Sequence, residues 1–319
     1  MRNIYIALCL LVLAGTGCTS KQIAQKVYGR YVPERKDDFA WENEYAAYRL
    51  YGPALAPENP SNGVDLWLKA SPEMIVDSFY YRETQLHLPY HINYGKGLDC
   101  YKVGHTAGCG GVVAMTCDVN QETGEQEPKL WGGGPYSRWE VLEQTPEKLV
   151  FRLFYDSLLV RDKVLQEQLT ITAEAGKLLN KAEVVISDKT QADEAANAEE
   201  AAFPLWLGGG IYLHDTVENY LIDDVTGLIA YAEDALSDKQ AAKMNYEHDG
   251  STSQGRTYVA VRTPGATVQK IIDGTLVSLA QYRLGDTFTY YFGGCWSEWT
   301  DGVKAFKNDI DWFNALEKE

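Results

Sequence analysis

The chain comprises 319 residues, of which 45% are hydrophobic, and it carries a formal net charge of −16 from 45 acidic and 29 basic side chains. A chain of this length can bury a sizeable core, and large β-sandwiches of this size often form a single domain. The acidic balance excludes nucleic acid as an expected partner, because phosphate binding requires a basic surface.

The N-terminus has the three parts of an export signal. Arg2 is followed by an apolar run from Ile4 to Leu13 and then by small residues up to Cys18. The run is about half of the ~20 residues that a membrane-spanning helix needs. We therefore expect a signal peptide over residues 1–17, lipidation at Cys18, a tether over residues 18–30 and an outer-membrane anchor that faces the periplasm. Cleavage without lipidation is the alternative.

Segments with strand character dominate the body of the chain. Leu149, Phe151, Leu153 and Tyr155 recur at every second position, and clusters of Gly, Asn, Asp or Pro separate successive segments. Because no helical periods intervene, we expect an all-β fold, a large antiparallel β-sandwich. The expected strands are Tyr45–Tyr51, Val64–Lys69, Arg138–Leu142, Leu149–Tyr155, Val164–Thr172, Lys177–Ile186, Trp206–Leu213, Tyr258–Arg262, Ala266–Ile272, Leu276–Leu284 and Phe288–Phe292.

The C-terminus is the one clear helix in the sequence. Its apolar residues fall on one face at helical spacing: Val303, Phe306, Ile310, Phe313 and Leu316. The stretch Thr190–Ala202 breaks the strand rhythm, and it is expected as a solvated excursion or a short helix. Since no linker is long enough to separate two domains, residues 31–319 are expected to form a single β-sandwich domain.

The segment Leu86–Gly111 differs from the rest in charge. It holds His87, His91 and His105, several lysines and tyrosines, and a single acid. Imidazole can exchange protons at physiological pH, and cations stabilise developing negative charge. Because sites are often built on loops over a rigid scaffold, the segment is a candidate site for proton abstraction beside a carboxylate. Packing of its aromatic rings on a sheet face is the alternative.

The same segment contains candidate residues for a metal site and for a disulfide. His87 and His91 are four residues apart, but Pro89 between them disfavours a helix, and no complete ligand set is present. We therefore expect no cofactor and no metal, with a zinc or calcium ion as the alternative. Cys100 and Cys109 flank a glycine-containing loop and are candidates for a disulfide, with buried free thiols as the alternative.

Aromatic and basic residues elsewhere suggest carbohydrate binding. Arg35 could grip an anionic group and Trp41 could stack on a sugar, although a salt-bridged turn explains the same residues. Trp296 and Trp299 either line a sugar cleft or pack under the terminal helix. His214 ends an expected strand, either as a catalytic partner or as an ordinary strand-end residue.

The chain resembles an uncharacterised lipoprotein domain family of polysaccharide-degrading Gram-negative bacteria. The resemblance is carried by RxDDxAWEN from Arg35, AxRxYGP from Ala47, GxGLDCYKVG from Gly95 and GCGG from Gly108. It implies a galactose-mutarotase-like β-sandwich, a fold shared with several polysaccharide lyases, and the family includes a dehydratase of ulvan oligosaccharides. The chain departs from the family at His105, where relatives carry proline.

The resemblance implies elimination of water across C4 and C5 of a terminal uronate. The base would be His91 or Tyr101, or else His214. Lys102 and Arg35 would neutralise the carboxylate and the enolate, while His105 or a tyrosine would protonate the departing hydroxyl. The remaining substrate-binding candidates are Trp41, Asp99, Trp296 and Trp299.

Two other classes of protein stay open. The first is a carbohydrate-binding or mutarotase-like lipoprotein that holds sugar without breaking a bond. The second is a glycoside hydrolase or polysaccharide lyase, for which Asp65, Asp99 and Glu298 could supply a carboxylate pair. In every case the expected partners are an oligosaccharide and, through Cys18, a membrane.

Overall fold

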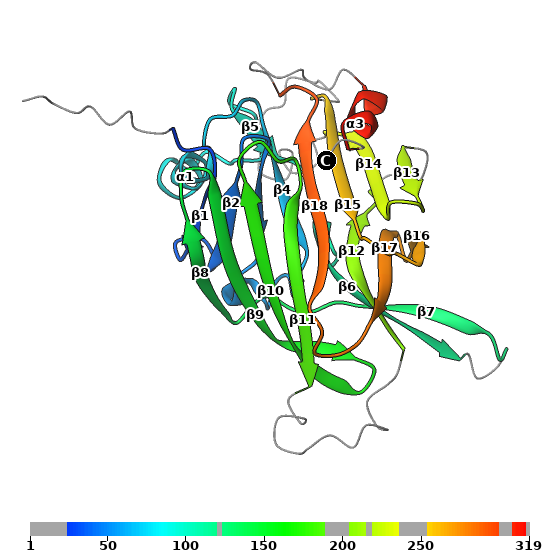
Figure 1. Ribbon diagram of the computed structural model, residues 1–319. Coiled ribbons are helices and arrows are strands. Elements are labelled where there is room, and N and C mark those ends of the chain that lie inside the picture. The colour runs from blue at the N-terminus through cyan, green and yellow to red at the C-terminus, as the bar shows by residue number, and fades with distance from the viewer. Residues whose placement is uncertain are drawn as a thin grey trace, which may run out of the picture.

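The computed structural model describes residues 24–119, 123–188, 204–214, 219–235, 254–299 and 308–316. The described chain forms three antiparallel β-sheets. The expected all-β sandwich is therefore confirmed (Figure 1). The lipidation candidate Cys18 and the stretch Thr190–Ala202 lie outside the described residues.

Sheet A is an N-terminal meander in which each strand pairs with the next along the chain. Its second, third and fourth strands are buried along their whole length, so their sequences lack the alternation of half-exposed strands. The strands are β1 (Tyr28–Val32), β2 (Asp38–Glu42), β3 (Ala46–Leu50), β4 (Val64–Lys69) and β5 (Gly97–Asp99).

Sheet C is the eight-stranded sheet whose central strands face the viewer in Figure 1. Its order is β13-β14-β15-β18-β11-β10-β9-β8. Strand β9 alternates buried and partly exposed residues from Lys148 to Tyr155, as its sequence predicts. The strands are β8 (Arg138–Gln144), β9 (Lys148–Val160), β10 (Lys163–Glu174), β11 (Asn180–Asp188), β13 (Tyr220–Asp223), β14 (Leu228–Asp234), β15 (Arg256–Arg262) and β18 (Phe288–Trp296).

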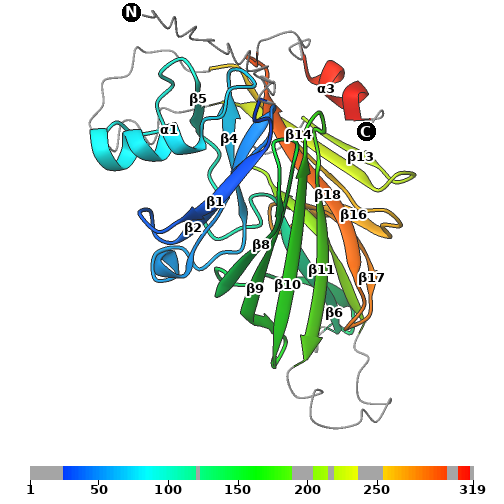
Figure 2. The same ribbon diagram turned by 60° about the vertical axis from the view of Figure 1, so that its left-hand side comes forward.

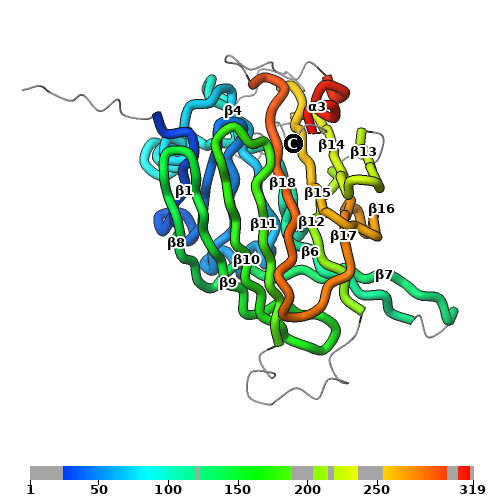
Figure 3. Tube along the Cα trace, viewed as in Figure 1, coloured from blue at the N-terminus to red at the C-terminus, as the bar shows by residue number. Residues whose placement is uncertain are grey.

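Sheet B has the order β16-β17-β12-β6-β7 and packs behind β15 and β18 (Figure 3). Its central strand β12 contains three glycines, and a Cβ at Gly209 would lie 2.8 Å from the Tyr290 ring. The glycines therefore allow sheets B and C to approach closely. The strands are β6 (Cys109–Val119), β7 (Gln126–Trp131), β12 (Leu205–Tyr212), β16 (Val268–Ile272) and β17 (Thr275–Tyr282).

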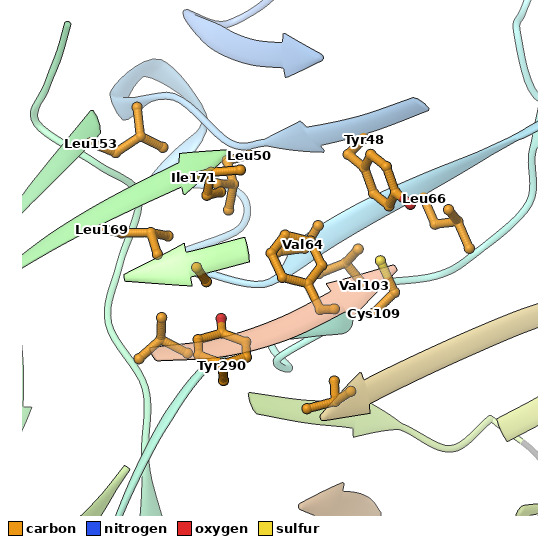
Figure 4. Close-up of a cluster of buried hydrophobic side chains, with 14 of the residues drawn as sticks. Tyr48, Leu50, Val64, Leu66, Val103, Cys109, Leu153, Leu169, Ile171 and Tyr290 are labelled. Atoms are coloured by element: carbon orange, nitrogen blue, oxygen red, sulfur yellow. The ribbon is translucent and has the colours of Figure 1, made fainter. Parts of the chain in front are cut away.

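The main hydrophobic core lies between the sheets. Figure 4 shows Leu50 and Val64 of sheet A, Leu169 and Tyr290 of sheet C, and Cys109 of sheet B gathered in one cluster. Each of these side chains is almost fully buried. The core therefore joins the three sheets.

Helices lie at the edges of the sandwich. Helix α1 (Val76–Tyr81) continues into a π-helical turn, η2 (Arg82–Leu86), and both lie on the side of sheet A in Figure 2. A short 3-10 turn, η1, spans Pro53–Leu55. Helix α3 (Asp309–Leu316) forms where a C-terminal helix was expected. Among the described residues, no helix is long and apolar enough to cross a membrane.

Candidate functional site

Three of the five predicted catalytic residues come together in space. Nε2 of His214, just after β12, lies 2.5 Å from the carbonyl oxygen of Lys102, in the segment between β5 and β6. The Tyr101 ring packs edge-on against the imidazole, with 4.7 Å between centroids. Nδ1 of His214 lies 2.8 Å from Oε2 of Glu233, on β14. We call Tyr101, Lys102, His214 and Glu233 the His214 site.

Tyr101 holds the loop of Lys102 against sheet B. Its hydroxyl lies 2.8 Å from the carbonyl of Tyr212 and 3.2 Å from that of Gly108. The backbone N–H of Tyr212 in turn donates to the Gly108 carbonyl. Burial raises the pKa of Tyr101 well above its ordinary value. Tyr101 is therefore placed as a neutral positioning group rather than as a base.

The two neighbours of His214 fix its protonation. A carbonyl oxygen only accepts hydrogen bonds, so Nε2 must carry the proton that it shares with Lys102. Burial lowers the pKa of His214, but the hydrogen bond and charge of Glu233 more than offset it, so the pKa is raised. A carboxylate and a carbonyl both accept hydrogen bonds, so this arrangement suits a ring that is protonated on both nitrogens, and the raised pKa favours that form.

An open groove lies beside the same loop. It has a volume of about 400 Å³, and its lining includes Asn62, His105, Trp131 and Asp273. His105 is exposed and Trp131 is half-buried, with its Nε1–H donating to Thr116 Oγ1. We call this cavity the Trp131 groove. It combines an aromatic face with polar groups, as sugar-binding sites do.

His91 and Asp99 lie in a different place, a buried cluster around Arg49. The guanidinium lies 2.5 Å from Asp65, 3.4 Å from Asp99 and 3.7 Å from Asp38. Burial raises the pKa of Asp99 well above its ordinary value and lowers the pKa of His91. We call Arg49 and its three carboxylates the Arg49 cluster. Asp99 is 3% exposed, so it does not present its carboxylate to a substrate.

Arg35 lies at the edge of this cluster. It is half-buried, and although burial by itself lowers the pKa of Arg35, the hydroxyl of Tyr90 and the charge of Asp38 raise it above the ordinary value. The hydroxyl of Tyr90 also accepts a hydrogen bond of 2.8 Å from Arg49. Arg35 therefore helps to balance the buried carboxylates, and no contact joins it to the His214 site among the described residues.

The expected sugar-stacking role of the tryptophans does not fit their burial. Trp41 is fully buried and its Nε1–H donates to Asn180, so it is a core residue. Trp299 is 2% exposed and donates to the Glu44 carbonyl. Trp296 is equally buried, although it lies under an open hollow of about 520 Å³ that Glu298 also lines. All three rings are therefore buried packing residues, and Trp296 lies in the main core rather than under the terminal helix.

The predicted disulfide is wrong. Cys100 and Cys109 are free thiols, as are Cys117 and Cys295. Cys100 lies 3.8 Å from the Thr257 hydroxyl, while Cys109 is fully buried in the main core. Among the described residues, no group of three His, Cys, Asp or Glu side chains is arranged so that it could hold a metal ion.

Glu233 and Arg49 are centres of charge that the sequence did not single out, although Arg49 is the arginine of the AxRxYGP motif. Both are charged residues in short strands of mostly apolar residues, LIAYAED and AAYRL. A charge in such a strand is rarely buried without a partner. That signal could have marked both residues, but it could not have named their partners.

Comparison with known proteins finds one matching family and one similar protein. Residues 15–319 match the model of a family described as "Domain of unknown function (DUF4861)". The chain is also similar to "Uncharacterized protein P7" of Formosa agariphila, with 26% identity over 301 residues. The match covers 91% of this chain and 66% of the relative, so the chain spans slightly less than two thirds of that protein.

Proposed function

Since the chain belongs to the DUF4861 family, whose function is unknown, we propose that it is a carbohydrate-active lipoprotein that removes water from the uronic-acid end of oligosaccharides. The observation that carries the proposal is the His214 site. A histidine, the carboxylate that orients it and an exposed lysine meet there, although His214 and Lys102 are 112 residues apart in sequence. A base oriented by a third group is a common arrangement for proton transfer.

His214 is the acid and base of the proposed reaction. Glu233 holds Nδ1–H, so loss of the other proton leaves Nε2 as the base. Nε2 must leave the Lys102 carbonyl when substrate binds, since hydrogen bonds in free enzymes often rearrange on binding. It then takes the C5 proton, the C4–O bond breaks, and the imidazolium returns the proton to the departing oxygen. The products are water and a C4=C5 double bond conjugated to the carboxylate.

Lys102 supplies the positive charge that this step requires. A proton beside a carboxylate is too weakly acidic for imidazole unless a cation stabilises the enolate. The Lys102 side chain is exposed, while its backbone is tied to His214. We propose that its ammonium pairs with the carboxylate of the terminal uronate.

The Trp131 groove supports a sugar as the substrate. His105 and Ala107 of its lining belong to the same segment as Tyr101 and Lys102. We propose that the groove holds the sugar next to the reacting uronate. His105 then contacts substrate without taking part in the reaction, in keeping with the proline of relatives.

The first test is turnover of the complete mature chain on short uronate-ended oligosaccharides. Near-ultraviolet absorbance should rise while the product mass falls by one water and the chain keeps its length. Shortened products would instead indicate a hydrolase or a polysaccharide lyase. Constant absorbance and mass would contradict the proposal.

Substitutions in the His214 site test whether its residues carry the activity. Lys102→Met should abolish turnover, and His214→Gln should lower it by at least about 100-fold. His87→Asn is the matched control from the same segment, because His87 is exposed and its left-handed backbone suits asparagine. The control should keep full activity. Full activity in Lys102→Met would refute the assigned role of the lysine.

A sugar-binding protein without catalysis is the second candidate. It is favoured by one observation, that both ring nitrogens of His214 are occupied in the resting structure. Oligosaccharide binding that persists in His214→Gln, without absorbance change in either protein, would select this candidate.

We also propose that Cys18 carries the lipid anchor and that the domain lies at the outer membrane on its periplasmic side. Metabolic labelling with a radioactive fatty acid should mark the wild-type protein and not Cys18→Ser. Equal labelling of both proteins would refute the anchor.

A further inference from the structure

The outer face of sheet C carries a basic groove that the proposed reaction does not use. The groove has a volume of about 570 Å³. It faces away from the main core, because its lining residues on β9, β10 and β11 alternate with the buried ones. Its lining holds four basic residues and two acidic ones, in a chain with a net charge of −16. The basic residues are Lys148, Lys177, Lys181 and Arg262.

Strand register gives the groove a linear floor. Thr172 pairs with Val150 on one side and Lys181 on the other, Lys181 pairs with Tyr291, and Tyr291 pairs with Arg262. The five residues therefore form one row across β9, β10, β11, β18 and β15, which lie side by side in Figure 1. With about 4.8 Å between strands, the row is about 19 Å long.

The cations of the groove are available to a ligand. Lys177 is exposed, and the side chains of Lys148 and Lys181 are 37% and 39% exposed. The last two pair with Glu143 and Glu183, but exposed ion pairs are weak and can exchange for a stronger anion. Arg262 donates to the carbonyl of Leu316, which holds its guanidinium at the end of the row.

We propose that this groove binds an acidic polysaccharide, with the uronate carboxylates on the lysines and a sugar ring against Tyr291. The row is long enough for an extended chain rather than a single ion. The groove is cationic and partly aromatic, which favours an anionic ligand over a neutral apolar partner. The choice of a polysaccharide rests on the proposed function, but the groove is separate from the His214 site and would bind without turnover.

The test is calorimetric binding of a galacturonate hexamer to the complete mature chain. The triple variant Lys148→Gln, Lys177→Gln and Lys181→Gln should bind at least about tenfold more weakly, and added salt should weaken the wild type. A control triple, Lys36→Gln, Lys96→Gln and Lys270→Gln, makes the same charge change elsewhere and should bind like the wild type. Equal losses in both triples, or none in the first, would overturn the proposal.

Two further measurements separate the explanations. Replacing the three groove lysines by arginine should restore binding, which shows that charge rather than misfolding is responsible. His214→Gln should bind the hexamer like the wild type, because the groove is separate from the His214 site. If the wild type binds the hexamer but shows no turnover, the proposed reaction is refuted and the groove proposal stands. Lysine-dependent binding to anionic vesicles, without binding to the hexamer, would overturn the polysaccharide in favour of a membrane surface.

Discussion

Glu167 is an acidic residue buried in the core. It is 1% exposed, and neither carboxylate oxygen has a hydrogen bond among the described residues. Within the same part of the chain, the hydroxyl of Tyr155, its cross-strand neighbour on β9, has no hydrogen bond either. Burial raises the pKa of Glu167 to about 8. The folded protein therefore holds this side chain in its neutral form at physiological pH.

This burial predicts a loss of stability in mild alkali. Because the folded pKa is raised, the folded state binds the proton more tightly, and stability falls as the pH rises from the unfolded pKa through about 8. Glu167→Leu should remove a decline of about 3 kcal/mol between pH 5 and pH 8. Urea unfolding at the two pH values measures the difference. The same decline in wild type and variant would show that another group is responsible.

The pair of His214 and Glu233 predicts how activity depends on pH. Because Glu233 raises the pKa of His214, the neutral base forms only above that raised value, and turnover should fall as the pH drops through it. Glu233→Gln removes the charge, so the acidic limb of the pH profile should move to lower pH. The maximal rate should fall by about 10-fold or more as the ring loses its orientation. An acidic limb at the same pH in the variant would contradict the assignment of His214 as base.

At the scale of elements, one guanidinium connects four strands of sheet A. Arg49 on β3 reaches Asp38 on β2, Asp65 on β4 and Asp99 on β5. Burial raises the pKa of Asp38 to about 6. Removal of the arginine would leave three buried carboxylates without their shared cation.

Arg49→Leu should therefore lower the free energy of unfolding by about 3–5 kcal/mol. Arg152→Leu is the control, because Arg152 also pairs with a carboxylate on a neighbouring strand, but its side chain is 34% exposed. The control should cost less than about 1 kcal/mol. Chemical denaturation of both variants makes the comparison, and equal losses would mean that the Arg49 cluster stabilises no more than a surface pair.

The elements differ in how far the sequence predicts them. Strand β4 begins and ends where the sequence places it, because Val64–Lys69 is bounded by a glycine and by turn residues. Strand β2 was missed because both its faces are buried and it has no alternation. Helix α1 was missed because a tertiary contact starts it: Glu42 accepts hydrogen bonds from the N–H groups of Ile75 and Val76. Local patterns cannot contain such a signal.

The residues of the His214 site were predictable in part from the sequence, but their contacts were not. Tyr101 and Lys102 stand in a segment of unusual charge, and His214 ends a recognisable strand, so residue type and position identify all three. Their contact depends on the pairing of β12 with β6, which sequence spacing does not determine. Because strand pairing could not be derived from the sequence, Trp41 was predicted to stack on a sugar, whereas it is a buried core residue.

At the scale of the whole molecule, the free cysteines predict insensitivity to reductant. Cys100, Cys109, Cys117 and Cys295 are all unpaired. Thermal unfolding should give the same Tm with and without dithiothreitol, and alkylation after unfolding should modify all four thiols without prior reduction. A Tm that falls in reductant would show that an oxidised bond stabilises the fold after all.

The His214 site also has a consequence for refolding. Lys102 lies in the connection between sheets A and B, His214 follows a strand of sheet B, and Glu233 belongs to sheet C. No subset of the sheets can assemble these three groups, and contacts between distant parts of a chain form slowly. After dilution from denaturant, catalytic competence should therefore return later than tryptophan fluorescence, with the last docking of the sheets as its limiting step.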